Sequence, residues 1–116
     1  MRMPAKGRLD VVGSSTMSPQ GSETINLEVP AGEQWRILEI GLTDVGPPGQ
    51  PGSSAQLLVQ EGAAWKTVRS LAASNGTSPL AVERDFSEGT KLRLVRRNSA
   101  GQREVTAWVS GIVFGN

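Results

Sequence analysis

The 116-residue sequence contains no cysteine and no histidine, and these two absences exclude much of the common catalytic and metal chemistry. Without cysteine there is neither a disulfide framework nor a thiol nucleophile. Without histidine, the commonest general base and the commonest transition-metal ligand are missing, and so is any Ser–His–Asp or Cys–His arrangement. We therefore predict a protein that is not an enzyme and that uses no cofactor and no metal.

Aromatic residues and long apolar runs are also scarce. Tyrosine is absent, and tryptophan and phenylalanine together make up 4% of the chain. No apolar run reaches the length of a membrane span, and the basic N-terminus is not followed by the apolar stretch of a secretory signal. A core built mainly from valine, leucine, isoleucine and alanine is thin for this length, and association would bury more apolar area. We expect a homo-oligomer with no membrane partner.

Turn-forming residues, in contrast, are abundant: 14 glycines and 7 prolines are spread along the whole chain. Between them lie short alternating segments that are typical of β-strands, and no window shows a capped helical stripe. Eight strands are predicted, at residues 8–13, 23–29, 34–45, 55–60, 64–71, 80–84, 91–97 and 104–114. This pattern predicts an all-β, two-sheet antiparallel sandwich of the jelly-roll kind. Residues 1–7 are expected to be a flexible N-terminal tail or arm, and residues 8–116 a single β-sandwich domain.

The long predicted strand at 34–45 contains a break in its alternation. Trp35 and Ile37 share one parity, whereas Leu38, Ile40 and Leu42 share the other. Such a change indicates either a β-bulge or a stretch that is buried on both faces.

The net charge of +1 conceals an uneven distribution of charges. From Glu23 to Glu61 there are six acids and one base, whereas residues 62–116 carry eight bases and four acids. In the favoured interpretation, acidic and basic strands lie side by side and offset each other. In the alternative, two oppositely charged faces meet in a head-to-tail oligomer.

A basic cluster stands near the C-terminal end of the sequence. Lys91, Arg93 and Arg97 fall on one face of a strand, while Arg96 falls on the opposite, apolar face. The cluster is either an anion or nucleic-acid patch or, as we favour, a solvated strand face. No aromatic residue alternates with the arginines in the sequence, so stacking on bases is not supported and no direct nucleic-acid partner is expected.

The three tryptophans are the largest apolar side chains available. Trp35 and Trp108 lie within strongly apolar strands and are predicted to pack in the core. Trp65 opens a strand, and core burial is favoured there over a role as an interface anchor.

Glu39 with Glu61 is the one carboxylate pair that we considered for glycoside hydrolysis. We favour solvent-exposed positions for both side chains, because a sequence cannot show the separation that this chemistry requires.

Three stretches together carry a resemblance to a known group of proteins: VPAGEQWRIL at 29–38, SEGTKLRL at 87–94 and VTAWVSGIVF at 105–114. They resemble segments of small virion proteins of tailed bacteriophages, in particular the jelly-roll head decoration (cement) proteins, which sit as trimers on the capsid. The resemblance implies a structural protein, made in the host cytoplasm, that binds and stabilises the capsid surface. Its partners would be itself, as a homotrimer, and the major capsid protein. The alternative is a phage tail, baseplate or fibre module that binds host glycan or another tail protein.

A cement protein grips its lattice through arms and loops, and the chain offers candidates for both. Prolines lower the entropy that a loop loses when a partner immobilises it. The candidate interaction residues in the N-terminal arm, the proline-rich loop and the tryptophan-bearing strand are Arg2, Lys6, Arg8, Pro47, Pro48, Pro51 and Trp65.

Overall fold

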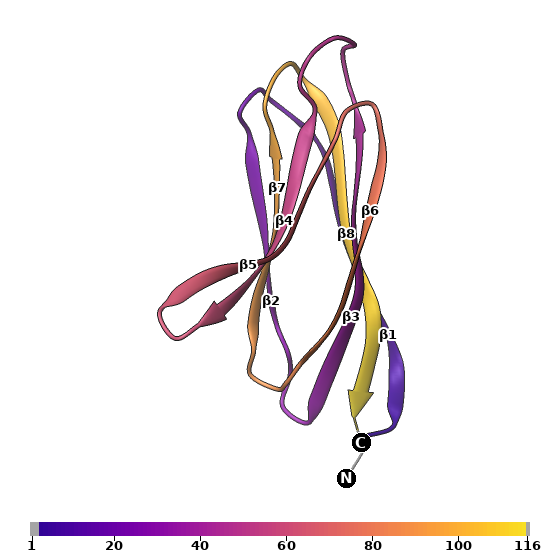
Figure 1. Ribbon diagram of the computed structural model, residues 1–116, viewed down its shortest axis with the longest axis vertical. Coiled ribbons are helices and arrows are strands. Elements are labelled where there is room, and N and C mark those ends of the chain that lie inside the picture. Colours follow the sequence, from indigo (N-terminus) through magenta and orange to yellow (C-terminus); the bar gives the residue numbers. More distant parts are fainter. Residues whose placement is uncertain (1–2, 116) are drawn as a thin grey trace.

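The computed structural model describes residues 3–115 and folds into eight β-strands arranged in two stacked sheets (Figure 1). The strands are β1 (Ala5–Met17), β2 (Ser22–Glu28), β3 (Glu33–Val45), β4 (Ser53–Glu61), β5 (Ala64–Ala73), β6 (Gly76–Phe86), β7 (Lys91–Asn98) and β8 (Arg103–Gly115). The predicted all-β sandwich is confirmed, and each predicted strand corresponds to one of these eight.

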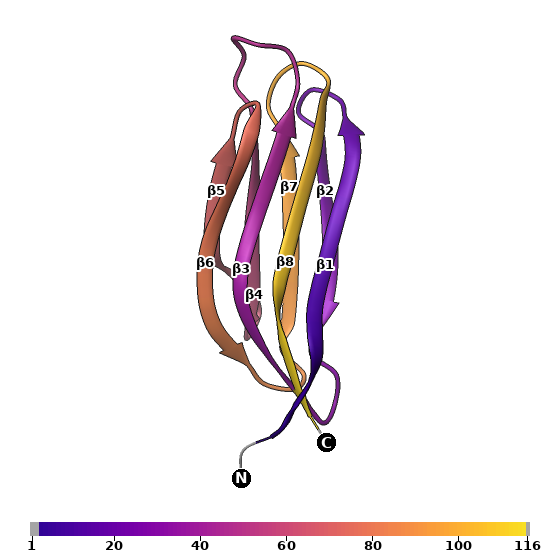
Figure 2. The same ribbon diagram turned by 90° about the vertical axis from the view of Figure 1, so that its right-hand side faces the viewer.

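The sheet topology is that of a jelly roll. One sheet has the strand order β1-β8-β3-β6 and the other β2-β7-β4-β5, with antiparallel pairing throughout. Only the β4–β5 hairpin joins neighbours within one sheet, because every other connection crosses to the opposite sheet. Figure 2 shows the first sheet face-on, with β8 between β1 and β3.

The core lies between the inner faces of the two sheets. Ile37, Ile40 and Leu42 of β3 are fully buried there and pack with the alternate residues of β8 and of the opposite sheet. The predicted break in β3 is a β-bulge: the register shifts between Ile37 and Glu39 in the pairing with both neighbouring strands. Opposite β8 the extra residue is Leu38, which is exposed, whereas opposite β6 the extra residue lies on β6 between Ala81 and Arg84.

The N-terminal boundary predicted from the sequence is corrected by the structure. β1 begins at Ala5, so residues 5–7 belong to the sandwich and not to a tail. Ala5 pairs with Phe114 and Gly7 pairs with Val113, because β8 extends to Gly115 and offers backbone partners along its whole length.

The favoured interpretation of the charge distribution is confirmed. Glu23 of β2 forms an ion pair with Arg96 of β7, and Glu28 lies opposite Lys91 in the same strand pair. Acidic and basic segments that are distant in the sequence are thus neighbouring strands, and their charges offset one another locally.

A fully buried ion pair joins the two central strands of the first sheet at one end of the sandwich. Asp44 on β3 and Arg103 on β8 both have 0% exposed side chains. The guanidinium donates from Nε to Oδ1 at 2.8 Å and from Nη2 to Oδ2 at 2.7 Å, a two-point arrangement that matches the planar geometry of both groups. This pair was not foreseen from the sequence.

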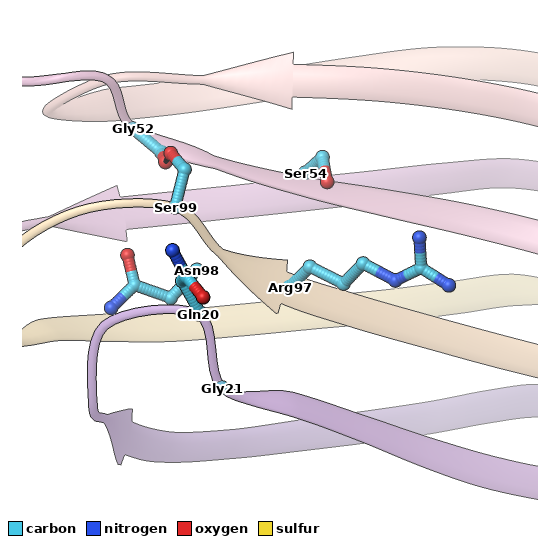
Figure 3. A pocket seen from close by; sticks show the side chains of 7 residues that line it. All are labelled: Gln20, Gly21, Gly52, Ser54, Arg97, Asn98 and Ser99. Atoms are coloured by element: carbon cyan, nitrogen blue, oxygen red, sulfur yellow. Dashed lines mark hydrogen bonds between the residues drawn. The ribbon is translucent and has the colours of Figure 1, made fainter.

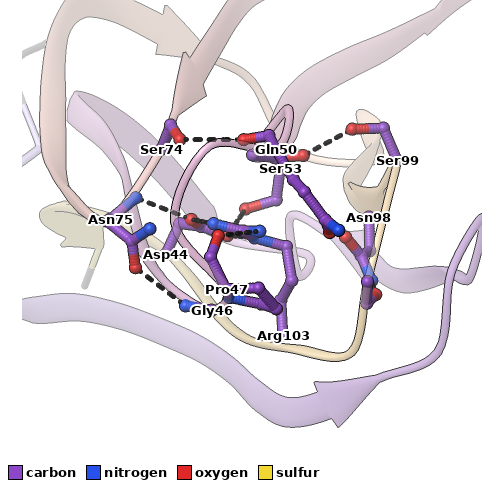
Figure 4. A network of polar contacts seen from close by, with 12 residues as sticks. Asp44, Gly46, Pro47, Gln50, Ser53, Ser74, Asn75, Asn98, Ser99 and Arg103 are labelled. Carbon is purple, nitrogen blue, oxygen red and sulfur yellow. Dashed lines mark hydrogen bonds and ion pairs between the residues drawn. The ribbon is translucent and has the colours of Figure 1, made fainter.

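The same two side chains hold the surrounding loops (Figure 4). The Ser53 hydroxyl donates to Asp44 Oδ1 at 2.7 Å, and the Asn75 backbone N–H donates to Oδ2 at 2.8 Å. Arg103 Nη1 donates to the Pro47 carbonyl at 3.3 Å. The Asp44 carboxylate therefore connects Ser53, Asn75 and Arg103, which lie in three separate segments of the sequence.

We expect Asp44→Ala to lower the free energy of unfolding by about 3–5 kcal/mol, because it leaves the Arg103 guanidinium buried without a counter-ion. Asp85→Ala is the matched control, since Asp85 pairs with Arg36 but has a 45% exposed side chain. That control should lose no more than about 1 kcal/mol. Urea unfolding monitored by circular dichroism measures the free energy of unfolding of both variants. Equal losses of stability in the two variants would show that burial of the Asp44 pair does not determine its contribution.

The buried pair also predicts a dependence of stability on pH. The hydrogen bonds from Arg103, Asn75 and Ser53 lower the pKa of Asp44 from 3.8 to about 2. The stabilisation is complete above about pH 5 and is lost as the pH falls through 3.8 towards 2, because the carboxyl of the unfolded chain binds a proton first.

Ser53→Ala separates this contribution from those of the other carboxylates. It removes one hydrogen bond to Asp44 and so raises the pKa of that carboxyl in the folded state, while its pKa in the unfolded state is unchanged. The pH-dependent loss of stability should therefore begin at the same pH as in the wild type, but it should be smaller and should end at a higher pH. Unfolding curves recorded between pH 5 and pH 2 measure the shift, and superimposable wild-type and Ser53→Ala profiles would refute it.

Candidate interaction surfaces

The described residues form no deep polar cleft. A pocket of about 300 Å³ lies at one end of the second sheet, where the β1–β2 turn meets the start of β4 and the end of β7 (Figure 3). Its lining residues are Gln20, Gly21, Gly52, Ser54, Arg97, Asn98 and Ser99. Within residues 3–115 no three carboxylates gather to hold a metal ion, and no helix long and apolar enough to span a membrane is present.

Glu39 and Glu61 lie in different sheets and have separate partners. Glu39 accepts a hydrogen bond from Trp108 Nε1 at 3.2 Å on the outer side of β3. Glu61, at the end of β4, forms an ion pair with Lys66 at 2.9 Å. The structure shows no contact between the two carboxylates.

The predicted interaction residues do not form a single site. Lys6 is near the end of β1 that lies at the bottom of Figure 2, whereas the proline-rich loop lies at the top. Pro48 and Pro51 are exposed, and Pro47 is half-buried above Arg103. Arg2 lies outside the described residues.

The two positions in the N-terminal arm are already occupied by local contacts. Lys6 donates to Glu33 Oε2 at 2.9 Å, so its side chain joins β1 to the start of β3. Arg8 is 84% exposed, with its Nε 3.7 Å from a carboxylate oxygen of Asp10 on the same strand. Of these two, only Arg8 offers a largely free side chain.

The outer surface of the β1-β8-β3-β6 sheet is broad and carries apolar side chains, and we call it the apolar face. One row crosses all four strands, from Val12 through Trp108 and Gly41 to Pro79. Val12 is 63% exposed. The face also includes Val45, Ile112 and Phe114.

Trp108 belongs to this face, which corrects the prediction that it packs in the core. Its neighbours Ala107 and Val109 take the inward positions of β8 and are fully buried, so the alternation of the strand directs Trp108 outward. The indole lies flat over Gly41, where a Cβ would come within 1.9 Å of a ring carbon. Trp35, in contrast, packs in the core as predicted.

The size of the apolar face matches that of a protein interface. Three of its strands have 13 residues. At about 3.3 Å per residue and about 4.8 Å between strands, four such strands cover roughly 800 Å². A standard stable interface buries about 800 Å² per partner. The charges on this face are largely paired, Arg8 with Asp10 and Arg36 with Asp85, so little net charge opposes association.

The outer surface of the β2-β7-β4-β5 sheet differs in character, and we call it the basic face. Seven of the Lys and Arg side chains in residues 3–115 form ion pairs with carboxylates, and Arg69 donates to two backbone carbonyls. The remaining three are Lys91, Arg93 and Arg97, and all stand on the outer side of β7. Among the described residues, the cations with neither an ion pair within 4.0 Å nor a backbone acceptor are therefore all on this one strand, and Lys91 has Glu28 as its register partner on β2.

Trp65 also lies on the basic face, where it is half-buried, so the favoured prediction of core burial is wrong. It pairs with Gln60, whose neighbour Val59 takes the inward position. The guanidinium of Arg93 stacks on the Trp65 ring at 3.9 Å from the centroid, although β4 separates the two strands. An aromatic ring thus joins the arginines in space, a contact that no local sequence pattern signals.

Comparison with known proteins identifies the fold. No family model and no curated protein matches the sequence. Among solved structures, the Yersinia pseudotuberculosis-derived mitogen is similar, with 13% identity over 90% of this chain and 86% of the mitogen and a TM-score of 0.60. The chain is a jelly-roll β-sandwich.

Two further jelly rolls illustrate the range of proteins that share this architecture. The Drosophila NLP core has 14% identity over 94% of this chain and 99% of that core, with a TM-score of 0.53. A triple-jelly-roll protein of an archaeal virus has 16% identity and a TM-score of 0.58. The match covers 99% of this chain but only 31% of the viral chain. At such low identity the likeness concerns the fold alone.

We expect Gly41→Ala to destabilise the domain by about 1–3 kcal/mol, because the added methyl group must displace the Trp108 ring. The displaced indole should become more exposed and its fluorescence emission should shift to the red. Gly7→Ala, where a Cβ meets no atom within 4 Å, is the matched control and should change neither property. Unchanged emission in Gly41→Ala would show that Trp108 does not lie against this glycine.

Proposed function

We propose that this protein is a non-catalytic structural component of a virion that associates with itself and stabilises a bacteriophage capsid surface. The observation that carries the proposal is the apolar face, on which Val12, Trp108 and Phe114 are presented by a rigid four-stranded sheet. Apolar side chains that gather on an outer sheet surface are typical of an interaction site.

The shape of the molecule supports a role in assembly. Principal extents of 52 × 28 × 19 Å describe a flat, elongated block with two broad faces. Interfaces of standard size need a surface of this breadth, and a well-paired rim of charges favours specificity over non-specific adhesion. The sequence resemblance to cement proteins supports the more specific assignment, a homotrimer whose further partner is the major capsid protein.

At the level of the fold, the proposal is compatible with the viral jelly roll described above, since that protein uses the same architecture within a virus. The absence of cysteine and histidine is compatible with a structural role as well. We accordingly place the protein on the capsid surface after synthesis in the host cytoplasm.

Self-association is tested with Val12→Asp. A carboxylate at the β1 end of the apolar row should be desolvated on association, and we expect the dissociation constant of the oligomer to rise at least tenfold. Ala72→Asp introduces the same charge at an exposed position of β5 and should leave the oligomer intact. Analytical ultracentrifugation at micromolar concentration measures both variants, and a wild type that is a stable monomer would contradict the proposal.

Binding to the capsid is tested with phage capsids that lack this protein. Added wild-type protein should bind them and raise their melting temperature in differential scanning calorimetry. If it neither binds nor shifts the melting, the decoration role is incorrect even where self-association is observed.

A second candidate function is supported by Trp65. Its position on an outer sheet surface, next to hydrogen-bonding side chains, is suited to a tail or baseplate module that binds a glycan. Wild-type protein that binds no polysaccharide would remove this candidate.

A further inference from the structure

The basic face contains a surface that the capsid role does not use. Arg93 is held in place from two sides: its guanidinium stacks on Trp65, and its Nε donates to Asn26 Oδ1 at 3.2 Å. Its two Nη groups have no hydrogen-bond partner within residues 3–115. A guanidinium that is pre-positioned with free donors is ready to bind a carboxylate or sulfate at two points.

The pocket of Figure 3 is the far end of this same surface. Ser54 and Arg97 line the pocket, and they are also register partners on the outer side of β4 and β7. Gln60, the partner of Trp65, stands six residues further along β4 than Ser54. At about 3.3 Å per residue, the surface from Trp65 to the pocket is about 20 Å long.

The β4–β5 hairpin shapes the other end. In Figure 1 its tip bends away from the opposite sheet. The β4–β5 register shifts between Leu57 and Leu58. A bulge increases local twist and can re-aim a side chain. Here the bend brings Trp65 over Arg93, so that the two form one platform.

Between the platform and the pocket the surface combines polar side chains with Val95, which lies between Arg93 and Arg97 on the outer side of β7 and is 5% exposed. Gln56 and Gln60 of β4 and Thr67 of β5 provide amide and hydroxyl groups, and Leu58 is the neighbouring apolar side chain. The core of a stable protein interface is depleted of charge and rich in apolar area. The basic face, with its three cations on β7, lacks that composition.

We propose that the basic face binds an extended anionic polysaccharide, with Arg93 and Arg97 binding its carboxylate or sulfate groups. Trp65 provides the flat apolar surface for a sugar ring, and the glutamine and threonine side chains bond its hydroxyls. The inference rests on the second proposed function, binding of a glycan, and is independent of the capsid role. Single-stranded nucleic acid is the less suitable polyanion, because only one aromatic ring is available for stacking.

The test measures binding by isothermal titration calorimetry at low and moderate salt with four probes: heparin, polygalacturonate, dextran and an oligo-dT 20-mer. We expect the wild type to bind heparin and polygalacturonate, with an affinity that falls as salt rises, and to leave dextran unbound. Arg93→Gln should weaken binding at least tenfold. Arg93→Lys should weaken it severalfold, because it keeps the charge but not the planar pair of donors.

Arg8→Gln is the matched control. It removes one exposed positive charge from the opposite side of the sandwich, and it should change the affinity less than twofold. Trp65→Leu leaves the net charge unchanged and should still weaken binding severalfold. Circular dichroism verifies that each variant is folded.

Each remaining outcome overturns the inference in a different way. Equal losses of polysaccharide affinity in Arg8→Gln and Arg93→Gln would show that the polysaccharide is attracted by the net charge of the protein only. Dextran binding equal to that of polygalacturonate and unaffected by Arg93→Gln would leave the glycan function standing but exclude an anionic ligand. Tighter binding of the oligo-dT probe would assign the surface to nucleic acid, and no binding of any polysaccharide would remove both the inference and the glycan function.

Discussion

The buried ion pair between Asp44 and Arg103 organises one end of the sandwich. Two full charges removed from water are tolerated only where geometry and additional hydrogen bonds compensate for the lost hydration. Both conditions are met here, because the carboxylate also accepts bonds from Ser53 and Asn75 and the guanidinium reaches the Pro47 carbonyl. The result is that the proline-rich loop, which has no regular structure of its own, takes its position from the ends of β3 and β8.

With its loops held in this way, the sandwich presents two broad faces of contrasting chemistry. The alternation of each strand sends one set of side chains to a shared core and the other to an outer surface. On β8 the outward set includes Trp108 and Phe114, and on β7 it includes Lys91, Arg93 and Arg97. Each outer face therefore takes the character of its central strands, apolar in one sheet and basic in the other. We propose a different class of partner for each face on this ground.

Local patterns in the sequence were sufficient to predict the strands and the two-sheet sandwich, and they indicated either a bulge in β3 or a stretch buried on both faces. In β3 the alternation that includes Ile37 changes parity before Ile40 and Leu42, and both the strand and its irregularity can be read from that pattern. Long-range pairing is not contained in such patterns. The Asp44–Arg103 contact, the Arg93–Trp65 stack and the extension of β1 along β8 all depend on which strands become neighbours. The prediction that Trp108 packs in the core is wrong because it treats an apolar strand as buried on both faces. The alternation of β8, in which Ala107 and Val109 point inward, directs Trp108 outward.

The position of β8 has a consequence for how the domain is made. Its hydrogen-bond partners are β1 and β3, so the last of the eight strands to be translated is a central one and not an edge. Until β8 is synthesised, β1 has no neighbour in its sheet and β3 lacks one of its two partners. The first sheet of this domain therefore forms only when its last strand pairs between two strands that were made long before it.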